Sequence, residues 1–311
     1  MIVYNVEPYG YNQDAIALWR SAGFDYQEGC WAEVDKNQSF PQVKVMIVRL
    51  QRKVTKELLQ KFPHLKVLVS ATTGIDHLQV DDIRERNIKL VTLRGKDRFL
   101  SSIPSTAEHT WALLLALIRY VPAANEHVKS GGWNRDCYRG YQLKNKNLGL
   151  IGLGRTGKKV AKYADAFELN VRYYDPHVSG TQYEKVESLE KLISVSDILS
   201  FHVHLNEETE LLLNKDNIHY LQDNAILINT SRGKIWDEDA VVNRLFEKKL
   251  LGVAADVVAT EMDDIHHSEL IRAQQLDQNI IITPHIGGAT WDAMWSCEYF
   301  IAQETIKLDA S

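Results

Sequence analysis

The chain has 311 residues, of which 45% are hydrophobic and 25% charged, an ordinary globular composition with room for two hydrophobic cores. Its net charge of −5 and pI near 6.1 argue against a nucleic-acid-binding protein, which would usually carry a basic face. The longest apolar run, WALLLALI at 111–118, is shorter than the roughly 20 residues that a membrane-spanning helix needs.

The N-terminus, MIVYNVEPYG, has neither the basic start nor the long apolar stretch of a secretory signal, and it predicts a first strand instead. The three cysteines are odd in number and form no CxxC pair, which is the pattern of reduced thiols. They are Cys30, Cys137 and Cys297. We therefore expect a cytoplasmic protein.

Short apolar strand candidates alternate with helical runs along the whole chain. The predicted strands cover residues 2–6, 43–48, 65–71, 87–93, 147–154, 170–176, 198–203, 225–231, 250–257 and 279–285. Helical runs lie between most of them, for example at 13–23, 54–62, 156–167 and 237–249. Continuously apolar strands are typical of a parallel sheet that is buried on both faces, and their alternation with helices is typical of βαβ units. The sequence thus predicts an α/β fold with doubly wound parallel sheets.

Two irregular stretches interrupt this pattern. RGKDRFLSSIPS, at 94–105, precedes a long helix that ends near Pro122, and SGGWNRDCYRGYQL, at 130–143, precedes a fresh series of βαβ units. The final helix, at 290–308, has no strand left to pair with in the second series, and folding back onto the first would bury its Trp and Phe residues. We therefore expect a discontinuous domain, 1–103 with 286–311, and a continuous domain, 104–285.

A dinucleotide-binding fingerprint follows the first strand of the second series. Gly152, Gly154 and Gly157 have the GxGxxG spacing, and the next predicted strand ends at Asp175, 18 residues later. Such glycines allow a tight turn, a close approach to pyrophosphate and close packing of the helix, whose N-terminus attracts phosphates. Asp175 would bind the ribose hydroxyls and repel a 2′-phosphate. The pattern predicts NAD rather than NADP; a glycine-rich turn without a ligand is the alternative.

Polar residues occur where three other strands of the second series end. Arg232 follows the strand at 225–231, Asp256 and Glu261 lie at and beyond the end of 250–257, and His285 ends NIIITPH. Open α/β sheets bind ligands at these carboxyl ends. There an arginine can hold a carboxylate, and a carboxylate beside a histidine stabilises the imidazolium that gives up a proton. A salt bridge, a helix cap or a solvent-facing turn explains each residue alone, but the combination predicts hydride transfer.

The chain resembles the D-isomer-specific 2-hydroxyacid dehydrogenases over nearly its whole length. The resemblance lies in SATTGIDHLQ, SIPSTAEHTWALLLALIR, GGW, LGLIGLGRTGKKVA, HVHLNEETELLLN, AILINTSRGKIWDEDAV, GVAADVVATE and TPHIGGAT. It implies two Rossmann-like or flavodoxin-like domains, of which the discontinuous one binds substrate and the continuous one NAD. The implied reaction moves a hydride between NAD(H) and a D-2-hydroxy acid or its 2-keto acid.

The resemblance also implies roles for individual residues. His285 would be the acid/base, Glu261 its carboxylate partner, and Arg232 the residue that holds the substrate carboxylate. Besides the fingerprint glycines and Asp175, the positions that match cofactor-binding residues of the family are Arg155, Thr156, Val203, Thr230, Asp256, Gly287 and Gly288.

Three further positions match substrate-binding residues. Thr73 and Gly74 match a turn whose N–H groups bind the substrate carboxylate, and Arg49 matches an arginine near the substrate phosphate in phosphoglycerate dehydrogenases. A phosphorylated substrate is therefore one hypothesis, beside a hydroxypyruvate-like or glyoxylate-like one. Because the chain ends soon after its last helix, we do not expect the regulatory domain of the longer phosphoglycerate enzymes. The family pairs into homodimers through an arm that would be residues 105–145 here.

Two positions depart from the family pattern, since Met262 and His204 stand where proline is usual. The paired histidines of HVH and IHH lack a third ligand at suitable spacing, so no metal site is expected. An NAD-sensing binding module is the alternative function, because the corepressors called C-terminal binding proteins share the fold and keep the catalytic trio. A formate dehydrogenase is disfavoured by the short chain.

Overall fold

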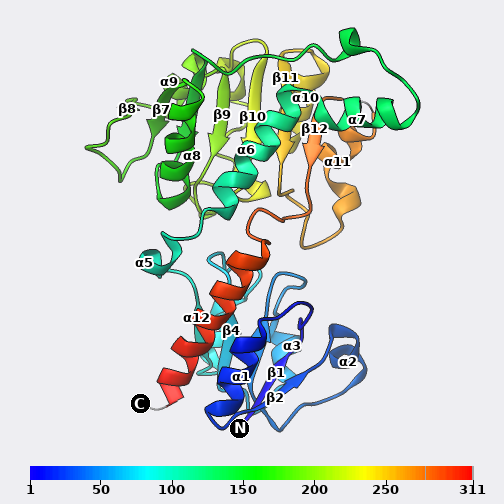
Figure 1. Ribbon diagram of the computed structural model, residues 1–311. Coiled ribbons are helices and arrows are strands. Elements are labelled where there is room, and N and C mark those ends of the chain that lie inside the picture. The colour runs from blue at the N-terminus through cyan, green and yellow to red at the C-terminus, as the bar shows by residue number, and fades with distance from the viewer. Residues whose placement is uncertain (277, 310–311) are drawn as a thin grey trace. The chain divides into compact units, whose positions relative to one another are not determined.

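The computed structural model describes residues 1–276 and 278–309 and divides the chain into two compact units (Figure 1). Unit 1 is Met1–Ile103 with the C-terminal segment that begins at Ala289, and unit 2 is Pro104–Gly288. The second boundary therefore follows residue 288 and not residue 285. The reason is that the backbone N–H groups of Ile286 and Gly287 donate to the carboxylate of Asp256, at 2.8 and 2.7 Å, which holds them in unit 2.

Unit 1 is a parallel sheet with the strand order β2-β1-β3-β4-β5. Its strands are β1 Ile2–Asn5, β2 Asp25–Glu28, β3 Val43–Val48, β4 Val67–Ser70 and β5 Lys89–Thr92. Its helices are α1 Gln13–Ser21, α2 Trp31–Lys36, α3 Lys56–Gln60, α4 Val80–Glu85, α5 Asp97–Leu100 and α12 Trp291–Asp309.

Each face of this sheet carries its own core, because successive side chains of a strand point to opposite sides. Val45 and Ile47 of β3 pack with α1 and α12, whereas Met46 and Val48 pack with α2, α3 and α4. Trp19 of α1 is fully buried in the first core. Figure 1 shows α12 lying along α1, so the end of the chain completes the fold of its beginning.

Unit 2 is a larger parallel sheet with the order β12-β11-β10-β9-β6-β7-β8. Its strands are β6 Asn147–Ile151, β7 Asn170–Tyr174, β8 Glu184–Lys185, β9 Ile198–Phe201, β10 Ala225–Asn229, β11 Leu250–Ala255 and β12 Ile280–Ile282. From β6 the chain adds β7 and β8 toward one edge of the sheet, and from β9 it adds β10, β11 and β12 toward the other edge. The point at which the winding reverses therefore lies between β6 and β9, where doubly wound sheets bind dinucleotides.

Helices cover both faces of the unit 2 sheet. They are α6 Ser105–Ile118, α8 Arg155–Ala166, α9 Leu189–Val195, α10 Glu238–Phe246 and α11 Glu269–Gln274. Helix α7 Val121–Lys129 follows α6 and has no buried residue. Short 3-10 turns occur at η1 Arg135–Tyr138, η2 Ile218–Tyr220, η3 Gly233–Ile235 and η4 Ile265–His267. Leu148 and Leu150 of β6 pack under α6 and α8, and Ile151 packs on the face that α9, α10 and α11 cover.

The predicted α/β fold with two doubly wound parallel sheets is confirmed. Two strands, β2 and β8, were not predicted. Both lie at a sheet edge and are polar, DYQE and EK, so they lack the apolar run by which buried strands are recognised. None of the described helices combines the length and the apolar character that crossing a membrane requires.

Candidate functional site

The GxGxxG segment forms the turn between β6 and α8. Gly152 has φ +88°, a left-handed backbone that glycine tolerates best, and a Cβ at Gly157 would lie 2.3 Å from the carbonyl oxygen of Gly152. Gly154 precedes the first residue of α8, is exposed, and has open space where a Cβ would point. Two glycines thus let the turn and helix pack, and the third leaves the backbone open. This is the arrangement that lets a pyrophosphate reach the N–H groups of a helix N-terminus.

We expect alanine to act differently at two of these glycines. Gly157→Ala should lower the free energy of unfolding by about 1–3 kcal/mol, because the new methyl group meets backbone. Gly154→Ala should cost less than about 1 kcal/mol, because nothing lies there, yet it should weaken NADH binding by narrowing the approach to the backbone. Urea unfolding and NADH fluorescence titration test both. Equal stability of the two variants would contradict the packing role of Gly157.

Asp175 follows β7 and lies beside this turn. Its carboxylate accepts hydrogen bonds from the N–H groups of Leu153 at 2.8 Å, His177 at 2.8 Å and Val178 at 3.1 Å. Only 8% of the residue is exposed. Asp175 therefore ties the glycine turn to the loop after β7, and this contact comes in addition to the ribose contact predicted for it.

His202 and Val203 follow β9 on the other side of the reversal point. The carbonyl of His202 and a methyl group of Val203 lie 2.6 and 2.8 Å from where a Cβ of Gly152 would stand, so both residues pack directly on the glycine turn. The His202 ring is hydrogen-bonded to the Ser200 hydroxyl at 2.9 Å, and burial lowers the pKa of His202 from 6.5 to about 4. His204, two residues on, is exposed.

The lowered pKa of His202, which is partly buried, predicts a pH dependence of stability. Between pH 6.5 and about 4 the unfolded chain binds a proton at His202 that the folded chain does not, so the free energy of unfolding falls as the pH falls. The full loss over this range is about 3 kcal/mol. Urea unfolding of His202→Asn should lack this slope, while His204→Asn should keep it. A slope that His202→Asn retains would contradict the assignment.

His285 and Glu261 form a hydrogen-bonded pair. Nδ1 of His285 lies 3.1 Å from Oε2 of Glu261, and the side chains are 23% and 17% exposed. Glu261 lies beyond β11 and His285 beyond β12, and these strands are neighbours in the sheet. His285 has φ +54°, an unfavourable backbone for a residue with a Cβ. Adjacent parallel strands thus bring together two residues that are 24 positions apart in the chain.

Asp256 holds the loop that carries His285. Its buried carboxylate accepts hydrogen bonds from the Thr283 hydroxyl at 2.6 Å and from the backbone N–H groups of Ile286 and Gly287, and Nε2 of His109 lies 3.2 Å away. Burial alone would raise the pKa of Asp256, but the hydrogen bonds from His109, Thr283 and the loop outweigh it and lower the pKa. Sequence reasoning missed the roles of His109 and Thr283, although both lie in segments that carry the family resemblance, because their contacts with Asp256 depend on how α6 and the strands are arranged.

Glu238, in the first turn of α10, holds the loop that carries Glu261. One carboxylate oxygen accepts the N–H of Ala259 at 2.7 Å, and the other accepts the Ser268 hydroxyl at 2.7 Å. Only 8% of Glu238 is exposed. The segment that departs from the family pattern at Met262 is therefore fixed at both ends by one buried carboxylate. This residue too was not recognised from the sequence.

Arg232 follows β10 and is half-buried. Its carbonyl accepts a hydrogen bond from the Asn229 side chain at 2.8 Å, and its Nη1 donates to the Ser231 carbonyl at 2.7 Å. A Cβ at Gly233 would lie 2.0 Å from the backbone of Val258, so η3 packs directly on the chain beyond β11. Thr230 is buried, with its hydroxyl 2.8 Å from that of Thr110. The chain on both sides of Arg232 is thus firmly packed.

Unit 1 contains the remaining predicted site residues. Thr73 and Gly74 lie in the turn after β4, where the Thr72 hydroxyl donates to the Gly74 carbonyl at 2.8 Å. Arg49 follows β3 and forms an ion pair with Glu298 of α12. All these residues lie at the carboxyl ends of their strands.

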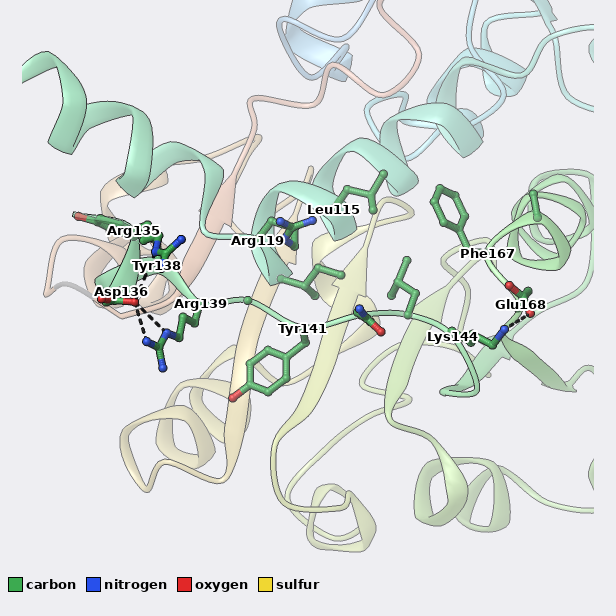
Figure 2. A pocket seen from close by; sticks show the side chains of 15 residues that line it. Leu115, Arg119, Arg135, Asp136, Tyr138, Arg139, Tyr141, Lys144, Phe167 and Glu168 are labelled. Carbon is green, nitrogen blue, oxygen red and sulfur yellow. Dashed lines mark hydrogen bonds and ion pairs between the residues drawn. The ribbon is translucent and has the colours of Figure 1, made fainter. Parts of the chain in front are cut away.

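A hollow of about 730 Å³ lies in unit 2, on the stretch that follows α6 (Figure 2). It is lined by the end of α6, by residues 135–144 and by the end of α8, and none of the predicted site residues lines it. Figure 2 shows ion pairs between lining residues, among them Arg139 with Asp136 and Lys144 with Glu168, each at 2.6 Å. The hollow belongs to the arm for which pairing of subunits is predicted.

Comparisons with known proteins agree on one family. Residues 111–287 match the model of the D-isomer specific 2-hydroxyacid dehydrogenase NAD binding domain. The chain is 35% identical to a hydroxypyruvate reductase of Thermotoga maritima, over 81% of this chain and 80% of that one. It is 34% identical to a D-3-phosphoglycerate dehydrogenase of Archaeoglobus fulgidus, over 96% of this chain and 55% of that one. The chain thus spans about half the length of the phosphoglycerate dehydrogenases it matches.

Solved structures are similar over the whole chain. The TT0316 protein of Thermus thermophilus matches with a TM-score of 0.84 and 29% identity, over 99% of this chain and 97% of that one. An NAD-dependent formate dehydrogenase of Staphylococcus aureus, solved in complex with NAD, matches with a TM-score of 0.82 and 26% identity, over 99% and 96%.

Proposed function

The chain belongs to the D-isomer-specific 2-hydroxyacid dehydrogenase family, with that family's NAD-binding domain at 111–287, and from this premise we propose that it interconverts a D-2-hydroxy acid and its 2-keto acid. The observation that carries the proposal is the pair of Nδ1 of His285 and Oε2 of Glu261, 3.1 Å apart. It lies beyond strands of the same sheet that holds the open glycine turn.

NAD supplies the hydride acceptor or donor, and the residues of the chain supply the proton and the binding groups. During reduction the carbonyl carbon of the keto acid gains a hydride and its oxygen gains a proton, which His285 donates from Nε2. Glu261 orients the ring through Nδ1 and balances its positive charge. Arg232 binds the substrate carboxylate. Thr73 and Gly74 are assigned to substrate binding by the family resemblance. Oxidation of the hydroxy acid reverses these steps.

The binding of NAD is proposed to use the residues around the reversal point. Gly154 leaves the backbone open for the pyrophosphate, and Arg155 and Thr156 present the first N–H groups of α8. Asp175 lies at the end of β7, where the ribose is expected. The remaining contacts are assigned to Val203, Thr230, Asp256, Gly287 and Gly288.

The test is the loss of NADH absorbance with a panel of 2-keto acids: hydroxypyruvate, glyoxylate, 3-phosphohydroxypyruvate, pyruvate and a branched keto acid. We expect rapid turnover with at least one of them, and faster turnover with NADH than with NADPH. Tight NADH binding with no turnover on the whole panel would refute the enzyme and favour the NAD-sensing alternative.

We also propose that two chains pair through residues 105–145. In and beside this arm Trp133 is 89% exposed, Val121 52%, Val128 50% and Tyr141 47%. Such side chains near a hollow are typical of a surface that another chain covers. Sedimentation equilibrium measures the mass directly, and a monomer at micromolar concentration would refute the pairing. A cytoplasmic location is likewise a proposal, supported by three cysteines that form no disulfide with one another.

A further inference from the structure

The topology of unit 1 marks an edge of its sheet as a candidate for ligand binding. Its strand order, β2-β1-β3-β4-β5, reverses direction between β1 and β3, and doubly wound sheets of this order bind ligands just beyond that point. Glu7 lies just beyond β1 and Arg49 directly beyond β3. The loop at 7–12 and helix α12 close over the same edge, since the indole N–H of Trp295 donates to the Gly10 carbonyl at 3.0 Å. The charges of Glu7 and Arg49, and their partners within the protein, decide which substrate group could bind at this edge.

Arg49 is already bound within unit 1. Its guanidinium forms an ion pair with Glu298, donates to the Tyr9 carbonyl at 2.8 Å and lies 5.7 Å from the centre of the Tyr11 ring. The Glu298 side chain is only 1% exposed, and its other oxygen accepts the backbone N–H of Asn12 at 2.7 Å. The positive charge that would attract a substrate phosphate is therefore compensated by a buried carboxylate.

A second buried carboxylate lies at the same edge. Glu7 is 3% exposed and accepts hydrogen bonds from Trp31 Nε1 at 3.1 Å and from the Gln51 N–H at 3.4 Å. Burial raises the pKa of Glu7 and of Glu298, against the attraction of the Arg49 charge. With both carboxyl groups ionised the three residues carry a charge of −1, and with one protonated they carry none. Neither state offers a net positive charge to a phosphate.

We infer that Glu298 is a specificity-determining residue, which neutralises Arg49 so that the enzyme acts on a 2-keto acid with an uncharged distal group and not on a phosphorylated one. The inference rests on the proposed function. It assigns Arg49 to an internal ion pair in place of the substrate phosphate that the family resemblance implies for it. A dianionic phosphate at this edge would meet buried carboxylates of the same sign and would find the guanidinium occupied.

The test compares kcat/KM for hydroxypyruvate and 3-phosphohydroxypyruvate. We expect the wild type to favour hydroxypyruvate at least about ten-fold. Glu298→Gln keeps the shape and the acceptor for Asn12 but removes the charge, so it should raise kcat/KM for the phosphorylated acid relative to hydroxypyruvate by about ten-fold or more, chiefly through KM. Glu304→Gln is the matched control, because Glu304 lies on the same helix and binds Lys96 at 2.5 Å. It should leave the ratio unchanged.

The outcomes separate this inference from the proposed function. Wild-type preference for 3-phosphohydroxypyruvate, or an unchanged ratio in a Glu298→Gln variant with a wild-type melting temperature, overturns the inference and leaves the dehydrogenase intact. If Glu298→Gln does not fold, Glu7→Gln removes a charge from the same edge and should shift the ratio in the same direction. Calorimetric titration of the NADH complex with 3-phosphoglycerate and with D-glycerate compares the affinities for a phosphorylated and an unphosphorylated acid without turnover. The inference can therefore be tested even if the wild type is inactive, and inactivity would refute only the proposed function.

Discussion

His285→Asn is expected to lower kcat by about 10²- to 10⁴-fold and to leave NADH binding intact. Asparagine keeps a polar side chain but has no group that exchanges a proton near neutral pH, and this range is what general acid catalysis contributes. Asparagine also tolerates the positive φ of residue 285 better than most residues, so the loop should keep its shape. Stopped-flow reduction of the best keto acid and NADH titration measure the two effects separately.

His204→Asn is the matched control for this result. His204 is an exposed histidine that follows β9 of the same sheet, and the proposed mechanism gives it no step. Its replacement should leave kcat within about two-fold, as for a surface change. A similar loss of kcat in both variants would show that the effect is not specific to His285. Full activity of His285→Asn would show that His285 is not the proton donor. Glu261→Gln should fall between these limits, because the ring keeps a hydrogen-bond partner but loses the compensating charge.

Asp256→Ala should have the largest effect on stability among the site residues, about 3 kcal/mol, together with a loss of kcat. The change leaves the Thr283 hydroxyl and the N–H groups of Ile286 and Gly287 without their acceptor in a buried place. These donors hold the loop that positions His285, so the proton donor should lose its place even in molecules that remain folded. Urea unfolding at pH 7 measures the stability, and kcat under saturating substrate measures the activity.

The sign of the pH effect distinguishes this role from simple packing. Because the folded-state pKa of Asp256 is lowered, its contribution to stability is present above the unfolded value of 3.8 and is lost as the pH falls below it. The stability difference between wild type and Asp256→Ala should therefore shrink in acid below about pH 4. Asp256→Asn, which keeps one acceptor, should lose less. A difference that stays constant with pH would indicate packing alone.

The apolar strands and the glycine turn were predictable from local sequence. Buried strands such as β6 and β10 are rich in leucine and isoleucine, and the glycines stand at fixed offsets because one turn and one helix contact require them. The polar edge strands β2 and β8 were not, since a strand paired on one side only needs no apolar pattern. An apolar pattern in the sequence indicates that a strand is buried, but it does not indicate which polar segments pair with a strand at the edge of a sheet.

The residues that support the site became evident only in the folded chain. His109 and Thr283 are 174 positions apart, Glu238 and Ser268 are 30 apart, and their hydrogen bonds depend on how strands and helices are arranged. A buried carboxylate such as Glu238 has the same appearance in a sequence as an exposed one. Its role comes from the donors that surround it and from the loss of solvent, neither of which is local.

The sequence by itself determined the fold class and the glycine turn that the NAD-binding domain of the family uses, because apolar strands and fixed glycine offsets are local features. It also predicts the trio of Arg232, Glu261 and His285, since strand ends in a doubly wound sheet lie at one edge. The tertiary structure decided what each charge binds. Arg49 and Glu298 are 249 positions apart, and only the packing of α12 against the start of the chain makes them an ion pair. The charge that an ionised side chain presents to a ligand depends mainly on the nearest opposite charge. For Arg49 that charge is Glu298, which lies near the other end of the chain.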